Sequence, residues 1–153
     1  MKNFLSLISL IFFVLIAFGS LEEFEGLDDG PKITSDTKPN VTVSARKLYK
    51  EYNANEIAAD EKYKGQIIQI TGIIRDIGND IMNNAYVTLI GDQYFGDIQC
   101  YFNEKSIVAS LSKGKRITVI GSCSGLMMNV QINNCIVKSV SYTHLTLPTN
   151  REV

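Results

Sequence analysis

The chain has 153 residues, of which 45% are hydrophobic and 20% are charged, and its formal net charge is −1. This composition is typical of a globular protein and excludes a chain that is disordered throughout. The charge is unevenly divided, because residues 20–43 carry six acids and two lysines whereas residues 44–140 carry eleven basic and nine acidic residues. Neither part has the strong basic excess that is typical of nucleic-acid-binding domains.

An apolar run opens the chain. Lys2 is followed by a largely hydrophobic, uncharged stretch from Phe4 to Phe18, which is shorter than the roughly 20 residues that a membrane-spanning helix needs. Ala17 and Gly19 supply the small residues of a signal-peptidase site. We therefore expect residues 1–19 to be a signal peptide and the protein to be exported to the periplasm or beyond. The alternative is an uncleaved N-terminal membrane anchor.

The next segment, residues 20–43, is acidic and shows no hydrophobic periodicity. Its prolines, glycines and acidic residues are typical of flexible tethers. We predict that this segment is an acidic flexible linker.

Two short helices are predicted after the linker. Ser44 is a good N-cap, because its hydroxyl can accept from a backbone N–H of the first turn. Asn53 followed by Glu56 resembles a capping box and predicts a second helix, which ends at Lys64-Gly65. Both helices are expected to pack on the following domain. The apolar positions of the first helix are Ala45, Leu48, Tyr49 and Tyr52. The tyrosines expected to pack on the domain are Tyr49, Tyr52 and Tyr63.

Five short apolar strands follow, and a helix interrupts them once. Side chains along a strand alternate between two faces, so Val87, Leu89, Ile98 and Cys100 are predicted to point into a core. The order strand-strand-strand-helix-strand-strand is that of the OB-fold, a five-stranded Greek-key barrel. We therefore predict a mainly β domain over residues 44–140. Its strands are expected at 65–77, 85–90, 96–102, 115–123 and 129–140, and its helix at 103–111.

The predicted fold indicates a binding surface. OB-folds bind oligomers on the face of their second and third strands, beside the loops that join strands one to two and four to five. Exposed tyrosines on this face can stack on bases or sugars, but a cross-strand tyrosine pair also stabilises a sheet by roughly 0.2–1 kcal/mol without any ligand. Both interpretations stay open. The candidate ligand-binding residues are Tyr86, Thr88, Gln99 and Tyr101 on the strands, and Leu126 and Met127 at an apolar loop tip.

The same residues carry a family resemblance. The segment SARKLYKEYNANEIAADEKYKGQIIQITGIIRDI, followed by DIQCYF, KGKRITVIG and VQINNCIV, resembles the tRNA_anti-like OB-fold family of small, often exported bacterial proteins. The resemblance covers about Val43 to Lys138. It implies an OB-fold and a binding role. The name of the family is an analogy with anticodon-binding OB-folds, and a fold alone does not fix a function.

The predicted domain contains no catalytic motif. It has no histidine, which excludes histidine-based triads and histidine-ligated metal sites. It also lacks a Gly-rich phosphate loop and a GxSxG nucleophile motif. We expect no enzyme activity, no metal and no cofactor.

Three cysteines, Cys100, Cys123 and Cys135, lie in the domain. An odd number allows at most one disulfide among them. In an OB barrel the fifth strand neighbours both the third and the fourth, so Cys135 can reach either partner. A Cys100–Cys135 disulfide, a Cys123–Cys135 disulfide and three buried free thiols all remain open.

The last residues, 141–153, follow a complete fifth strand and share none of its alternation. They resemble the translated sequencing-adapter tails of open reading frames from fragmentary assemblies, and they are excluded from fold reasoning. The alternative is an ordinary disordered C-terminus. The only histidine of the chain, His144, lies in this tail.

These observations predict an exported, non-catalytic OB-fold binding module. Its partner is expected to be a protein or a small or oligomeric ligand of the cell envelope. The alternative is a protein that binds single-stranded nucleic acid, which the fold and the two tyrosines favour and the low charge opposes. Contact with a membrane is expected only through an uncleaved N-terminal segment.

Overall fold

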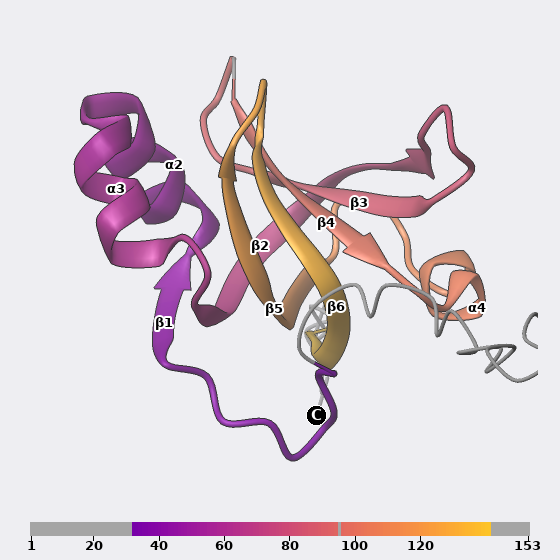
Figure 1. Ribbon diagram of the computed structural model, residues 1–153. Coiled ribbons are helices and arrows are strands. Elements are labelled where there is room, and N and C mark those ends of the chain that lie inside the picture. Colours follow the sequence, from indigo (N-terminus) through magenta and orange to yellow (C-terminus); the bar gives the residue numbers. More distant parts are fainter. Residues whose placement is uncertain (1–31, 95, 142–153) are drawn as a thin grey trace, which may run out of the picture.

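The computed structural model describes residues 32–94 and 96–141 (Figure 1). The predicted signal peptide or anchor, the linker up to residue 31 and the tail from residue 142 lie outside the described residues. In chain order the elements are β1 (Val41–Ser44), α2 (Ala45–Ala54), α3 (Glu56–Tyr63), β2 (Ile67–Asn79), β3 (Ala85–Ile90), β4 (Asp97–Phe102), α4 (Lys105–Ala109), β5 (Arg116–Leu126) and β6 (Val130–Ser141).

Strands β2 to β6 close into a barrel. The strand order is β1-β2-β3-β4-β6-β5, and β2 also pairs with β5, which closes the ring. One long strand makes this possible, because the first part of β2 pairs with β5 and its second part pairs with β3. Strand β6 lies between β4, to which it is parallel, and β5, to which it is antiparallel. This connectivity confirms the predicted five-stranded OB-fold.

A short strand that the sequence did not predict precedes the barrel. Val41–Ser44 pairs in parallel with Ile68–Thr71 of β2, so residues 41–43 of the predicted linker belong to a sheet. Four residues are too few to show a reliable alternation, and the pairing partner lies more than twenty residues further along the chain. Val43 is the residue of this strand that the core buries.

The two helices begin at polar caps. The Ser44 hydroxyl accepts from the Lys47 backbone N–H at 3.3 Å, as predicted. The second cap is Asn55 and not Asn53, because the Asn55 side-chain oxygen accepts from the Ala58 N–H at 3.1 Å. Asn53 lies inside α2, whereas Asn55 has an extended backbone (φ −160°) that suits a cap.

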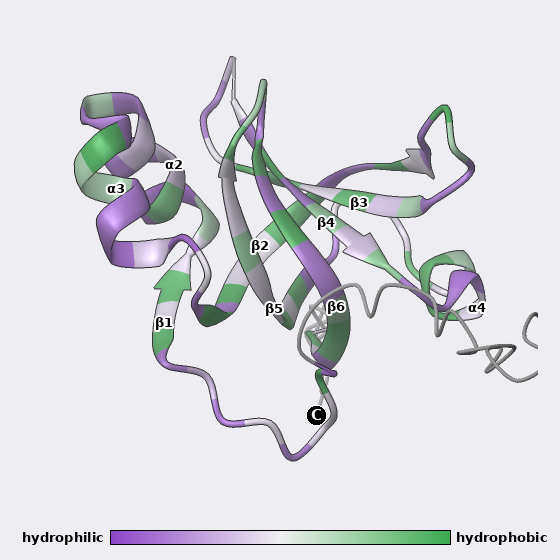
Figure 2. Cartoon of the chain, in the orientation of Figure 1, coloured by the Kyte–Doolittle hydropathy of each residue, from purple (hydrophilic) through white to green (hydrophobic). Residues whose placement is uncertain are grey.

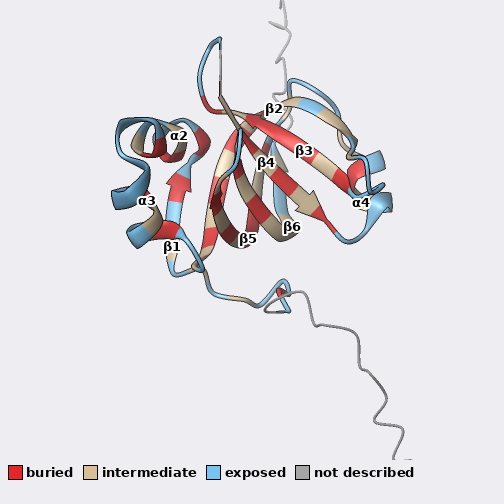
Figure 3. Ribbon diagram, turned by 45° about the horizontal axis from the view of Figure 1, so that its top comes forward, coloured by how far each residue is buried: buried red, intermediate tan, exposed pale blue. Residues whose placement is uncertain are grey.

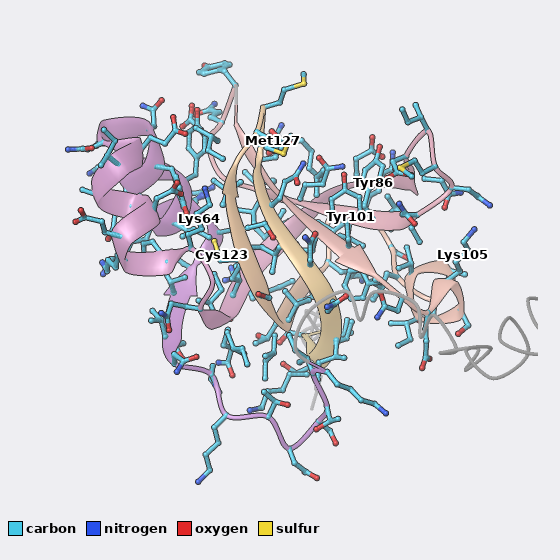
Figure 4. The ribbon with its side chains drawn as sticks, in the orientation of Figure 1. Lys64, Tyr86, Tyr101, Lys105, Cys123 and Met127 are labelled. Atoms are coloured by element: carbon cyan, nitrogen blue, oxygen red, sulfur yellow. The ribbon has the colours of Figure 1, made fainter. Side chains whose placement is uncertain are left out.

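Buried tyrosines hold the helices against the barrel. The Tyr52 hydroxyl donates to Asp60 Oδ1 at 3.1 Å and lies 3.5 Å from the sulfur of Cys123 on β5. The Tyr63 hydroxyl donates to Glu51 Oε2 at 2.8 Å. Burial raises the pKa of Tyr52 well above its usual range, so its hydroxyl remains a donor. Both tyrosines are buried, so the predicted packing role of Tyr52 and Tyr63 is confirmed. Cys123, which Tyr52 contacts, is labelled in Figure 4.

The core follows the alternation of the strands. Hydrophobic and hydrophilic residues alternate along the barrel strands (Figure 2), and the buried positions line the inside of the barrel (Figure 3). The helix between β4 and β5 is shorter than the predicted 103–111. It is α4, which spans Lys105–Ala109, and its N-cap, Glu104, makes no side-chain cap hydrogen bond. The predicted inward residues that the structure buries include Ile68, Ile70, Val87, Leu89, Ile98, Cys100, Ile117, Val119, Val130 and Ile132.

Candidate ligand-binding groove

A polar groove of about 690 Å³ lies on the outside of the barrel wall. One side is the loop between β2 and β3, and the other side is formed by the outward faces of β5 and β6. The end of β4 and the start of α4 lie between them. The groove thus includes the loop between the first and second barrel strands and the end of the third, which OB-folds use to bind oligomers, and it extends over the outward faces of the fourth and fifth barrel strands.

Strands β5 and β6 supply four polar side chains. The inward-facing neighbours Cys123 and Ile132 are buried, and the period of two therefore turns the residues on either side of them outward. The Asn133 side-chain amide donates to the Ser124 hydroxyl at 2.8 Å across the two strands. The outward residues that line the groove here are Ser122, Ser124, Gln131 and Asn133, all half-buried.

Asp80 organises the opposite wall. Its Oδ1 accepts from the backbone N–H groups of Met82 at 2.9 Å and Asn84 at 2.8 Å, and its Oδ2 accepts from the Asn84 side chain at 3.0 Å. The Asn84 backbone N–H is the main cause that lowers the pKa of Asp80, and the charge of Lys105 adds to the effect. Asp80 is therefore ionised at neutral pH and holds the loop in one conformation.

Two tyrosines meet at the β4 end of the groove. Tyr86 and Tyr101 are direct cross-strand partners, with ring centroids 6.1 Å apart and ring planes at 66°, an edge-to-face contact. The Gln99 side-chain amide donates to the Tyr101 hydroxyl at 3.0 Å. Burial, and then the charge of Asp80, raises the pKa of Tyr101. Tyr101 lines the groove, and Tyr86 lies next to Tyr101 (Figure 4).

The prediction that Thr88 lies on an exposed binding face is wrong. Its exposed fraction is 7%, and its hydroxyl donates to the Asp76 carbonyl at 3.5 Å. Thr88 pairs with Asp76 directly after a shift in the β2–β3 register between Ile74 and Asp76. Such a bulge bends the strand locally, so the simple alternation does not apply at this position.

The predicted apolar loop tip is only partly exposed. Leu126 ends β5, is half-buried and packs against the core. Met127 is 66% exposed and lies at the tip of the β5–β6 hairpin (Figure 4). Neither residue lines the groove. Asn129, beside them, donates from its side-chain amide to Gln99 Oε1 at 3.4 Å and so connects the hairpin to β4.

Sequence reasoning missed most of the groove. It placed the site on the second and third barrel strands and on the two loops that flank them, whereas half-buried polar residues of β5 and β6 also line the groove. A signal was available in the alternation of polar and apolar residues along these strands. A second signal was the repeated Asn-Asn pair, at 83–84 and at 133–134, because both pairs line the groove and one residue of each has a positive φ.

The three cysteines form no reactive centre among the described residues. Cys100, Cys123 and Cys135 are buried free thiols, and neither of the two disulfides considered above is present. Burial raises the pKa of Cys123 and of Cys135, so both stay protonated and are poor nucleophiles. Within residues 32–94 and 96–141, no cluster of three or more His, Cys, Asp or Glu residues is arranged to hold a metal ion.

The helices of the described part are α2, α3 and α4. None of the helices within that part of the chain is long and apolar enough to cross a membrane.

Comparison with known proteins gives a family match and a shared fold. The family model described as tRNA_anti-like matches residues 1–136. A crystal structure of a "putative nucleic acid-binding lipoprotein" from Klebsiella pneumoniae is 19% identical, with a TM-score of 0.51, and the match covers 63% of this chain and 91% of that one. At this identity the likeness shows the fold alone. No protein of curated function matches the chain.

A second solved structure is more distant. A "putative aspartyl-tRNA synthetase" from Leishmania major is 8% identical, with a TM-score of 0.42. The match covers 74% of this chain and 24% of that one, and it carries no argument about this protein.

Proposed function

The chain belongs to the tRNA_anti-like family of OB-fold proteins, and from this premise we propose that it is an exported, non-catalytic module that binds an elongated ligand in its groove. The observation that carries the proposal is the groove itself. Its volume of about 690 Å³ lies within the roughly 300–1,000 Å³ of small-molecule sites. An oligomer of a few units fits a groove of this size better than a flat protein surface does.

The walls of the groove support a binding role. The β2–β3 loop is held by three hydrogen bonds to Asp80, and the floor consists of barrel strands. A site on rigid elements needs little reorganisation when its ligand binds, which favours affinity. The buried cysteines and the scattered carboxylates supply no activated nucleophile or acid–base pair, so we propose binding without catalysis.

Export rests on the N-terminal segment. The apolar run before Gly19 supports a cleaved signal, and the lipoprotein from K. pneumoniae, which has the same fold, is in line with a protein of the cell envelope. N-terminal sequencing of protein from its native host should find Ser20 or Leu21 as the first residue. Recovery of Met1 in a membrane fraction would instead support an uncleaved anchor.

A second candidate function is the binding of single-stranded nucleic acid. The observation that favours it is the Tyr86–Tyr101 pair, because exposed aromatic side chains stack on successive bases. The ring centroids lie 6.1 Å apart in an edge-to-face arrangement, so one ring at a time can present its face to a base. The same pair also stabilises the sheet without any ligand.

Binding to groove variants tests the proposal. We would titrate the ¹⁵N-labelled full-length protein with uncharged oligosaccharides, with oligo-dT and with short neutral peptides. At least one class should shift the amide signals of residues 80–84 and 131–134, and Asn133→Ala should weaken that binding. Gln69→Ala is the matched control, because Gln69 is a half-buried strand residue outside the groove. The proposal fails when no class binds, or when binding is unaffected by Asn133→Ala.

A further inference from the structure

The chemistry of the groove lining identifies a class of ligand. Resting on the proposed function, we propose that the groove binds an uncharged, hydroxyl-rich oligomer, a neutral oligosaccharide, through the side chains of Ser122, Gln131 and Asn133.

Amide side chains match sugar hydroxyls. A hydroxyl both donates and accepts hydrogen bonds, and the Asn or Gln amide offers two N–H donors and a carbonyl acceptor. Asn83, Asn84, Asn103, Gln131 and Asn133 all line the groove, so both of its walls offer donors and acceptors. Phosphate oxygens only accept, so a phosphodiester group can pair with the amide N–H donors but not with the amide carbonyls.

The charge of the groove excludes a strong phosphate site. Among the described lining residues the charged ones are Asp80 and Lys105, which have opposite signs. Nucleic-acid sites gain most of their affinity from several lysines and arginines that neutralise phosphates. The arginines of this domain lie elsewhere: Arg46, Arg75 and Arg116 border two smaller hollows that share no residue with the groove.

Several groove groups are available to a ligand. Within the described part of the chain, the side chains of Ser122, Gln131 and Asn103 make no hydrogen bond to the protein, whereas Asn133 is fixed by its bond to Ser124. Ser122 and Gln131 are half-buried, so they are partly shielded from water and still face the groove. When a sugar hydroxyl binds Ser122 or Gln131, its hydrogen bond replaces one that the side chain made to water.

Tyr101 supplies the apolar part of the site. Its ring is half-buried beside the polar walls, and its hydroxyl is held by Gln99. A sugar ring has one face of C–H groups, and a tyrosine offers an apolar body with a polar tip to such a face. The aromatic ring of Tyr101 beside several amides and hydroxyls therefore suits a sugar.

The test compares sugars with a nucleic acid on the same protein. The full-length protein is applied to an array of uncharged and anionic oligosaccharides, and its affinities for the best uncharged glycan and for oligo-dT of twelve nucleotides are measured at 50 and 200 mM salt. We expect the glycan affinity to change less than twofold with salt. Oligo-dT that makes four phosphate contacts would lose affinity roughly 50-fold over the same range.

Variants locate the binding. Gln131→Ala should weaken the uncharged glycan roughly three- to tenfold, the effect of one lost hydrogen bond, and Gln69→Ala should leave the affinity unchanged. Binding of oligo-dT or anionic glycans alone, lost in Asn133→Ala, overturns the inference on ligand class and leaves the groove as a binding site. Failure of every probe, the short neutral peptides included, or glycan binding that is insensitive to both groove variants, overturns the proposed function as well.

Discussion

Truncation of Ile98 tests the inward and outward assignment on which the groove depends. Ile98 on β4 is fully buried and pairs with Leu89 on β3 and Val130 on β6. Ile98→Ala removes three carbon atoms, which at about 0.8 kcal/mol each amounts to about 2.4 kcal/mol of transfer free energy. The cavity that remains brings the expected loss of unfolding free energy to roughly 2–5 kcal/mol. At about 4 °C per kcal/mol, the Tm should fall by about 8–20 °C.

The neighbouring residue provides the control. Gln99 faces outward, and its side chain makes one bond to Tyr101 and one to Asn129, so Gln99→Ala should cost no more than about 1.5 kcal/mol per bond. Urea denaturation followed by circular dichroism measures both variants of the full-length protein. A larger loss for Gln99→Ala than for Ile98→Ala would refute the reasoning. Tyr101 shares the face of Gln99, so it would then point into the core and the groove would lose that wall.

Three further predictions concern stability. Glu51 accepts hydrogen bonds from Lys62 and Tyr63 of α3, and the bond from Lys62 is the main cause that lowers its pKa below 4.5. A lowered pKa in the folded state stabilises the fold above about pH 4.5, and this stabilisation is lost as the pH falls through the pKa of the folded state. The Tm of Glu51→Gln should therefore lie below that of the wild type at pH 7 and converge with it in acid, and a pH-independent gap would contradict this. Gly121→Ala places a methyl group 2.7 Å from the sulfur of Cys135 and should cost about 1–3 kcal/mol by overpacking, against a negligible cost for Ser122→Ala in the same urea titration. Deletion of residues 142–153 should change the unfolding free energy by less than about 0.5 kcal/mol, and a greater loss would show that the tail packs on the domain.

The fold was predictable because the strands repeat one simple signal. The alternation along the strands predicts from the sequence alone that Val87 and Ile98 point into the core. Side chains of a strand alternate with a period of two, and the inner face of this barrel is buried. Thr88 breaks the pattern for a reason that a local pattern does not contain. The register shift beside it lies on another strand, β2, and only pairing shows that the Asp76 backbone covers its side chain.

The site was less predictable than the core. A hydrophobic residue in a strand indicates the core by its type alone. A polar residue on an outward face can equally well face bulk solvent or line a groove. Gln131 and Asn133 were visible as polar strand positions, and Ser124 was visible as a loop residue. The Asn83–Asn84 pair was visible as part of a loop. Only barrel closure brings these segments together around one volume, because the loop and the strand residues lie about 40 to 50 positions apart in the sequence.

The Greek-key order explains why this groove is polar while the barrel wall around it is closely packed. Strand β6 is inserted between β4 and β5, so the outward residues of β4 and of the β5–β6 hairpin form one surface. Their inward neighbours, such as Cys123 and Ile132, carry the core. Changes at Gln131 or Ser122 therefore alter the ligand surface without altering the buried contacts. This separation lets one fold serve different ligands, and here the amide- and hydroxyl-rich lining with one charge of each sign favours an uncharged sugar over a phosphate backbone.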